Sequence, residues 1–149
     1  MNGRINSVTI LMADDDEEDC LLTREALAES RLLNDLRIVH DGEELLEYLR
    51  RRGRYANADA PRPGLILLDL NMPRKDGREA LREIKADPAL CAIPVVVLTT
   101  SQADEDIVRS YQLAASSYIT KPVNFEGLVE VMRELGHYWF DIVDLPPLR

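Results

Sequence analysis

Short apolar runs alternate along the chain with longer segments whose apolar residues recur every three or four positions. This alternation is typical of βαβ units, in which helices connect the parallel strands of one sheet. It predicts strands at residues 8–13, 36–40, 65–69, 94–99 and 117–120. The first, third and fourth runs are continuously apolar, as expected of strands that helices cover on both faces. We therefore expect an α/β protein with a doubly wound, five-stranded parallel sheet.

The segments between these runs are predicted to be helices, at residues 18–30, 42–51, 78–86, 104–114 and 124–143. The third of them ends where Asp87 precedes Pro88, because proline disfavours a helical conformation in the residue before it. Residues 53–64 form a polar loop that is long for a connection of this kind. The chain has 149 residues and no internal repeat, so we expect residues 1–149 to form a single domain.

Composition excludes two classes of partner. The chain carries 18 basic and 27 acidic residues, a net charge of −9, whereas nucleic-acid binding depends on basic patches. Its one basic cluster, RRRGR at 50–54, is interpreted as the solvated end of a helix. No apolar run approaches the roughly 20 residues that span a bilayer, so no membrane association is expected. Cys20 and Cys91 form no disulfide framework, which favours reduced thiols and a cytoplasmic protein.

Polar residues of complementary chemistry stand where the predicted strands end. Asp14 and Asp15 follow the first strand, Asp69 ends the third, Thr99 ends the fourth and Lys121 follows the fifth. Ligands of open parallel sheets bind beyond the carboxyl ends of the strands, so we expect these five side chains to converge.

Together these residue types suit phosphoryl transfer. Carboxylates such as Asp14 and Asp15 are oxygen ligands that Mg2+ prefers, and Asp69 has the chemistry both of a ligand and of a nucleophile that forms an acyl phosphate. The Lys121 ammonium and the Thr99 hydroxyl would stabilise charge on the transferred group. Each residue alone has an ordinary structural reading, as strand terminator or surface charge. Their joint placement favours the chemical one.

The later acids of the run at 14–19 need no chemical role at this stage. Acidic side chains are commonly found in the first turn of a helix, where they complement its dipole. We therefore interpret Glu17, Glu18 and Asp19 as dipole partners only.

Four segments, ILMADDD, LILLDLNMPRKDG, VVVLTTS and YITKP, stand in an order and at separations that resemble the receiver domain of two-component response regulators, over roughly residues 7–135. The resemblance implies a flavodoxin-like fold with strand order 2-1-3-4-5 and helices on both faces. It also implies a phosphorylatable signalling protein that accepts a phosphoryl group from a histidine kinase onto Asp69. Such a protein catalyses only its own phosphorylation and dephosphorylation, so it is not an enzyme with a separate substrate.

The same resemblance assigns further roles. The backbone carbonyl of Asn71 would complete the metal site of Asp14, Asp15 and Asp69, and Tyr118 would be the switch aromatic coupled to Thr99. The bond before Pro122 would be cis. Ala114 stands where many receivers have glycine, so we expect the preceding helix to end differently.

A narrower resemblance covers nearly the whole chain. The long loop at 53–64, the phrase SYQLAASSYITKPVNFEGL and the ending WFDIVDLPP are similar to stand-alone regulators paired with bacterial and cyanobacterial phytochromes. This similarity implies a light-sensing histidine kinase, a bacteriophytochrome, as the partner.

Two other functions are weighed against this one. Phosphatases of the haloacid-dehalogenase type also use a strand-end aspartate, but they need a general acid two residues later. That position is Asn71, whose amide cannot donate and reclaim a proton in this way. A pseudo-receiver that only binds partners is expected to lack the acid pair or the acceptor, and this chain has both.

The last predicted helix has a wider apolar face than docking on the sheet requires. One continuous apolar stripe is sufficient to dock the helix on the sheet, and a second line of apolar residues runs beside that stripe. We expect a homodimer through the fourth helix, fifth strand and fifth helix (104–114, 117–120 and 124–143), with Trp139, Phe140 and Ile142 in the interface. The alternative is a helix that covers its own aromatic residues. The stripe consists of Phe125, Leu128, Met132, Leu135, Trp139 and Ile142.

Overall fold

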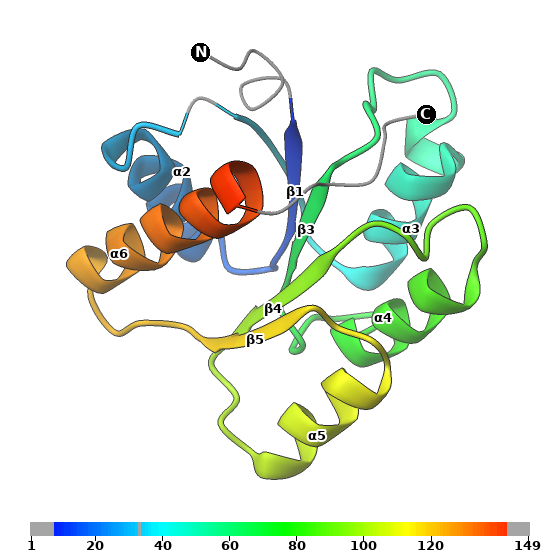
Figure 1. Ribbon diagram of the computed structural model, residues 1–149. Helices are drawn as coiled ribbons and strands as arrows, with labels where there is room; N and C mark the ends of the chain where they lie inside the picture. The colour runs from blue at the N-terminus through cyan, green and yellow to red at the C-terminus, as the bar shows by residue number, and fades with distance from the viewer. Residues whose placement is uncertain (1–7, 33, 143–149) are drawn as a thin grey trace.

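The computed structural model describes residues 8–32 and 34–142. Its five strands form one parallel sheet in the order β2-β1-β3-β4-β5, which confirms the expected topology (Figure 1). Each strand begins and ends within one residue of the predicted bounds. The strands are β1 (Thr9–Ala13), β2 (Asp35–Val39), β3 (Leu65–Leu68), β4 (Val95–Thr99) and β5 (Ser117–Thr120).

Helices cover both faces of this sheet. They are α2 (Glu17–Glu29), α3 (Gly42–Arg50), α4 (Gly77–Ala86), α5 (Asp104–Gln112) and α6 (Phe125–Gly136). Figure 1 shows α2 and α6 side by side on one face and α3, α4 and α5 on the other. Four of the five begin with a side-chain cap, in which an aspartate or asparagine accepts backbone N–H groups of the first turn. These caps are Asp16, Asp41, Asp76 and Asn124.

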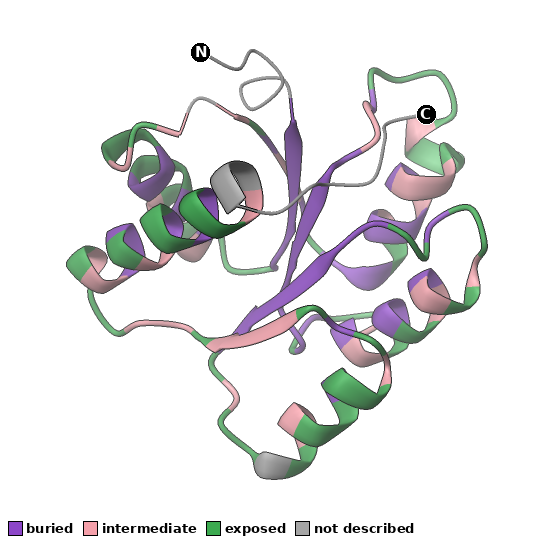
Figure 2. Ribbon diagram, in the orientation of Figure 1, coloured by how far each residue is buried: buried purple, intermediate pink, exposed green. Residues whose placement is uncertain are grey.

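Alternating strand residues divide the core into two layers. Leu11, Ile66 and Val97 pack toward α3 and α4, whereas Met12 and Leu67 pack toward α2 and α6. Figure 2 shows the central strands buried along their length and β5, at the edge, only partly covered. The sheet therefore holds the carboxyl ends of β1, β3 and β4 in fixed positions.

Three details depart from the expectations. The regular helix α6 ends at Gly136, and a wider helical turn over His137–Ile142 replaces the predicted continuation to 143. The loop at 53–64 contains a short 3-10 turn, Gly53–Tyr55. No described peptide bond is cis, so the bond before Pro122 is trans, the form that X-Pro bonds generally favour by about 0.5–1 kcal/mol.

Ala114 adopts the left-handed backbone conformation, with φ of 68°. A glycine reaches this conformation without strain, whereas a side chain with a Cβ atom costs roughly 1 kcal/mol there. The end of α5 therefore keeps the glycine-like geometry, and the expectation of a different shape was wrong.

Candidate functional site

A cluster of three carboxylates lies where β1 and β3 end. The backbone N–H of Asp69 donates to Ala13 at 3.0 Å, which sets the end of β3 against the end of β1. Asp14 is fully buried and Asp69 nearly so, with 8% of its side chain exposed, whereas Asp15 is exposed. One oxygen from each of Asp14, Asp15 and Asp69 lies within 4.8 Å of the others. Opposite ligands of a small octahedral cation lie about 4.2 Å apart, so the cluster fits a divalent ion with little adjustment.

Lys121 connects this cluster to β5 and α2. Its Nζ atom lies 2.6 Å from Asp14, 2.8 Å from Asp19 and 3.3 Å from Asp69. Asp19 is thus more than a dipole partner, and that interpretation was wrong. The first turn of α2 directs it inward, while Asp16 caps the helix. A single ammonium group therefore holds three carboxylates together.

Burial dominates the electrostatics of the cluster. It raises the pKa of Asp14 to about 6, although the hydrogen bonds from Lys121 and from the Asp16 backbone oppose this shift. Burial alone would lower the pKa of Lys121, but its hydrogen bonds to Asp14 and Asp19 outweigh burial and raise it. Buried negative charge is costly without compensation, so this site favours an additional cation.

Asp69 is held from two further sides. The Thr99 hydroxyl donates to Asp69 Oδ1 at 2.8 Å, and the Asn71 backbone N–H donates to the same oxygen at 3.2 Å. The loop after Asp69 passes close to α4, because a Cβ atom on Gly77 would lie 2.2 Å from the Asp69 carbonyl oxygen. Only glycine fits at that position, so the chain can turn sharply from Asp69 into α4.

Tyr118 is linked to the end of β4 through a polar network, which we call the latch: Arg78, Ser101, Asp106 and Tyr118. The Tyr118 hydroxyl donates to the Ser101 carbonyl at 3.0 Å. The Ser101 hydroxyl donates to Asp106 at 2.6 Å, and Arg78 holds both oxygens of Asp106 at 2.8 and 2.7 Å. Arg78 and then Ser101 lower the pKa of Asp106 to about 2.

Sequence reasoning missed the other three members of the latch. Arg78 follows the glycine that opens α4, Ser101 lies two residues after Thr99, and Asp106 lies in the first turn of α5. Their common signal is position, since each stands just beyond a strand end or at a helix start. Nothing in the spacing alone pairs Arg78 with Asp106, which are 28 residues apart.

The expected dimer residues are only partly described. Trp139 is half-buried, packs against the core between α2 and α6, and meets Tyr138 edge to face at 5.2 Å. Part of this aromatic surface thus covers the chain's own core. A groove of about 350 Å³ lies beside it, lined by Ile119 of β5 and by α6 residues including Val131 and Leu135. The side chains of Phe140 and Ile142 lie outside the described part of the chain.

Comparisons with known proteins agree with this geometry. The family model described as "Response regulator receiver domain" matches residues 10–133. Response regulator Rcp1 of Synechocystis sp. is 44% identical over 137 residues, which are 92% of this chain and 92% of Rcp1. Nothing in the described residues forms a helix suited to crossing a bilayer.

Two crystal structures cover almost the whole chain. The phosphorylated cyanobacterial phytochrome response regulator RcpA matches with a TM-score of 0.87 and 46% identity, over 95% of this chain and 99% of that one. The Mn2+-bound form of Rcp1 matches with a TM-score of 0.85 and 43% identity, over 94% and 99%.

Proposed function

The chain belongs to the response regulator receiver family, which accepts a phosphoryl group in a metal-dependent reaction, and we propose that Asp69 is its acceptor. The observation that carries this assignment is the convergence of Thr99, Lys121 and two further carboxylates on Asp69. Asp69 lies at the carboxyl end of β3, where ligands of doubly wound sheets bind. We take residues 1–149 as one receiver domain with a core of about 7–135.

Each side chain around Asp69 has a place in the transfer. A carboxylate oxygen of Asp69 attacks the phosphorus of a phosphohistidine, the P–N bond breaks, and its electron pair remains on the imidazole nitrogen. Lys121 and Thr99 lie within reach of the transferred oxygens and stabilise their charge. Mg2+, held by Asp14, Asp15, Asp69 and the Asn71 carbonyl, would supply further positive charge.

We propose a sensor histidine kinase of the bacteriophytochrome type as the phosphoryl donor. Support comes from RcpA, a cyanobacterial phytochrome response regulator that this chain matches over 95% of its length. The exposed apolar residue Val123 lies on the segment before α6 and lines a groove together with Lys121. It offers a partner an apolar contact near the proposed acceptor. We expect this exchange in the cytoplasm, where the two free cysteines stay reduced.

We further propose that the chain forms a homodimer through α5, β5 and α6, with Trp139, Phe140 and Ile142 in the interface. Support comes from the partly covered edge strand β5, the groove beside Trp139, and exposed Val108 and Tyr111 on α5. Exposed apolar residues gathered on one face are typical of protein contacts. Phosphorylation would act on this face through Thr99 and the switch residue Tyr118.

The two rival functions are not favoured. A multi-turnover phosphatase needs a general acid where Asn71 stands, and Asn71 offers only its backbone N–H to Asp69. A pseudo-receiver would not retain a buried acceptor with a hydroxyl and an ammonium group in contact with it.

Acetyl phosphate with Mg2+ tests the assignment directly. Intact-mass measurement should show a gain of one phosphoryl group, which is lost in Asp69→Asn and on chelation of the metal. Asp35→Asn is the matched control, because Asp35 lies at the amino end of β2, away from the carboxyl ends of the strands where Asp69 lies. Persistent labelling of Asp69→Asn would show that another residue is the acceptor.

A further inference from the structure

The long loop at 53–64 is held in place by several dedicated contacts. The Tyr48 hydroxyl of α3 donates to the Pro61 carbonyl at 2.8 Å, and Arg37 donates to the Asp59 carbonyl at 3.0 Å. Tyr55 packs edge to face on Tyr48, with ring centres 5.1 Å apart. Loops of this length in small domains are usually functional when they are ordered. This loop therefore has a defined conformation on the surface.

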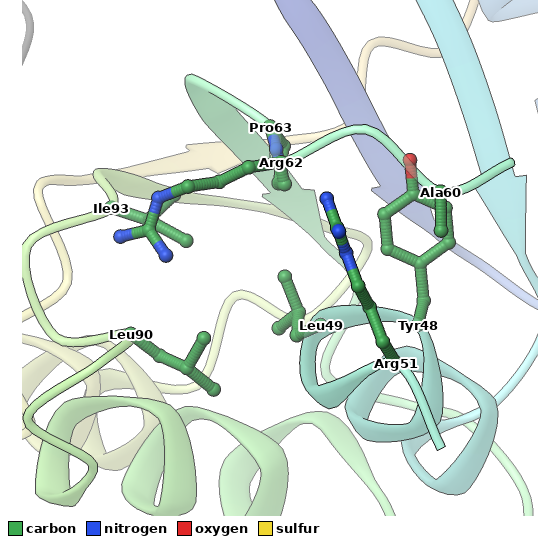
Figure 3. Close-up of a pocket in the computed structure, with 8 residues that line it drawn as sticks. All are labelled: Tyr48, Leu49, Arg51, Ala60, Arg62, Pro63, Leu90 and Ile93. Carbon is green, nitrogen blue, oxygen red and sulfur yellow. The ribbon is translucent and has the colours of Figure 1, made fainter. Parts of the chain in front are cut away.

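The loop forms one wall of a cavity of about 130 Å³ (Figure 3). The cavity lies at the amino ends of β3 and β4, whereas Asp69 follows the carboxyl end of β3. Five of its eight lining residues are buried and largely apolar, and two arginines contribute polar surface. The lining residues are Tyr48, Leu49, Arg51, Ala60, Arg62, Pro63, Leu90 and Ile93.

Two guanidinium groups border this cavity. Of the other arginines at 50–54, Arg50 pairs with Glu83 and Arg54 pairs with Glu47. Within the described residues, Arg51 and Arg62 have no carboxylate partner. Arg62 donates to the Ala89 carbonyl at 2.9 Å, which leaves most of its five N–H donors for a ligand. Figure 3 shows Arg62 above Leu90 in this view and Arg51 between Leu49 and Tyr48.

We propose that this cavity binds an acidic segment of a partner protein, with one apolar side chain inserted and flanking carboxylates paired with Arg51 and Arg62. Size favours a single side chain, because small-molecule sites usually measure about 300–1,000 Å³ and a cavity of about 150 Å³ holds one benzene ring. Charge favours flanking carboxylates, since Arg51 and Arg62 have no carboxylate partner among the described residues and attract acidic groups at short range. The site goes beyond phosphoryl acceptance and does not depend on it.

A peptide titration tests the proposal. The ¹⁵N-labelled full chain is titrated with the capped peptide acetyl-EDFED-amide, and amide resonances are followed by NMR. Saturable shifts are expected for residues that line the cavity. A peptide with glycine in place of phenylalanine should bind at least about tenfold more weakly, because it lacks the apolar anchor. A peptide with lysines in place of the acids should not bind.

Variants of the chain separate the two parts of the site. Arg51→Gln and Arg62→Gln should each weaken binding about two- to fivefold, the size expected for an exposed ion pair. The matched control is Arg82→Gln, an exposed arginine of α4 that does not line the cavity. Ala60→Leu should fill the cavity and abolish binding while both arginines remain, with a native amide spectrum as the check on folding.

Three results would overturn the proposal: equal affinity for the phenylalanine and glycine peptides, unchanged affinity in both arginine variants, or shifts confined to other surfaces. Benzoate that binds as tightly as the peptide would assign the cavity to small carboxylates instead. Asp69→Asn should bind the peptide as the parent does, so failure of phosphorylation and failure of this site are distinguishable.

Discussion

Replacing Asp106 by Asn should destabilise the folded chain and release the switch residue. Asp106 lies in the first turn of α5, with 16% of its side chain exposed, and its two oxygens receive Arg78 and the Ser101 hydroxyl. The substitution removes the negative charge that both donors share. Ser101, whose carbonyl holds the Tyr118 hydroxyl, then loses its fixed position.

The magnitude follows from the pKa of Asp106, which falls from 3.8 to about 2 on folding. A shift of that size corresponds to about 2 kcal/mol between the ionised and protonated forms. Because the folded pKa is depressed, this stability is present above the unfolded pKa and is lost as pH falls through the folded pKa. We expect Asp106→Asn to lower the free energy of unfolding by about 2 kcal/mol at pH 7, and by roughly half as much at pH 3.

Urea unfolding of both proteins at pH 7, 4 and 3 measures this difference. The matched control is Glu105→Gln, an exposed acid of the same helical turn, which should change stability little. Self-association of unphosphorylated Asp106→Asn should also exceed that of the unphosphorylated parent, because Tyr118 is freed. Equal stability at pH 7, or a difference that does not shrink toward pH 3, would refute the assigned role of Asp106.

Three further outcomes follow from the same structure. Mg2+ should raise the melting temperature of the parent by binding only the folded state, and Asp15→Asn should reduce that rise; an unchanged rise would place the ion elsewhere. Ala114→Gly should increase the free energy of unfolding by about 1 kcal/mol in urea titrations, because glycine adopts φ of 68° without strain; a loss of stability would contradict this reasoning. Light scattering should show a dimer in the parent and a folded monomer in Trp139→Asp; a monomeric parent at micromolar concentration would remove the proposed interface.

The central strands β1, β3 and β4 were predictable from sequence because they are buried on both faces. A continuous apolar run such as 65–68, with helical segments before and after it in the chain, is typical of a strand that helices cover on both faces of a parallel sheet. Asp14, Asp69, Thr99 and Lys121 converge because parallel strands end at one edge, so their meeting followed from the strand assignment alone.

Contacts between separate segments were beyond the sequence pattern. Whether Asp19 points inward depends on the residue at which α2 begins, since a shift of one residue would turn its side chain to another face of the helix. The pairing of Arg78 with Asp106 depends on how α4 and α5 lie on the sheet. The end of α6 was not predictable from the apolar stripe or from helix propensity, because a wider helical turn over His137–Ile142 replaces the regular helix.

We propose that the latch opposes the change that phosphorylation brings about. Thr99 donates its hydroxyl to Asp69 before phosphorylation, and the Ser101 backbone N–H lies 3.5 Å from the same hydroxyl oxygen. A phosphoryl group on Asp69 would offer Thr99 new acceptor oxygens, so the segment that carries Ser101 would be drawn with it. Before phosphorylation, the hydrogen bonds of Ser101 to Asp106 and of Tyr118 to Ser101 favour the held arrangement. On this proposal, contacts made only by the phosphorylated form would have to outweigh the loss of these hydrogen bonds before the released surface of α5 and β5 is populated.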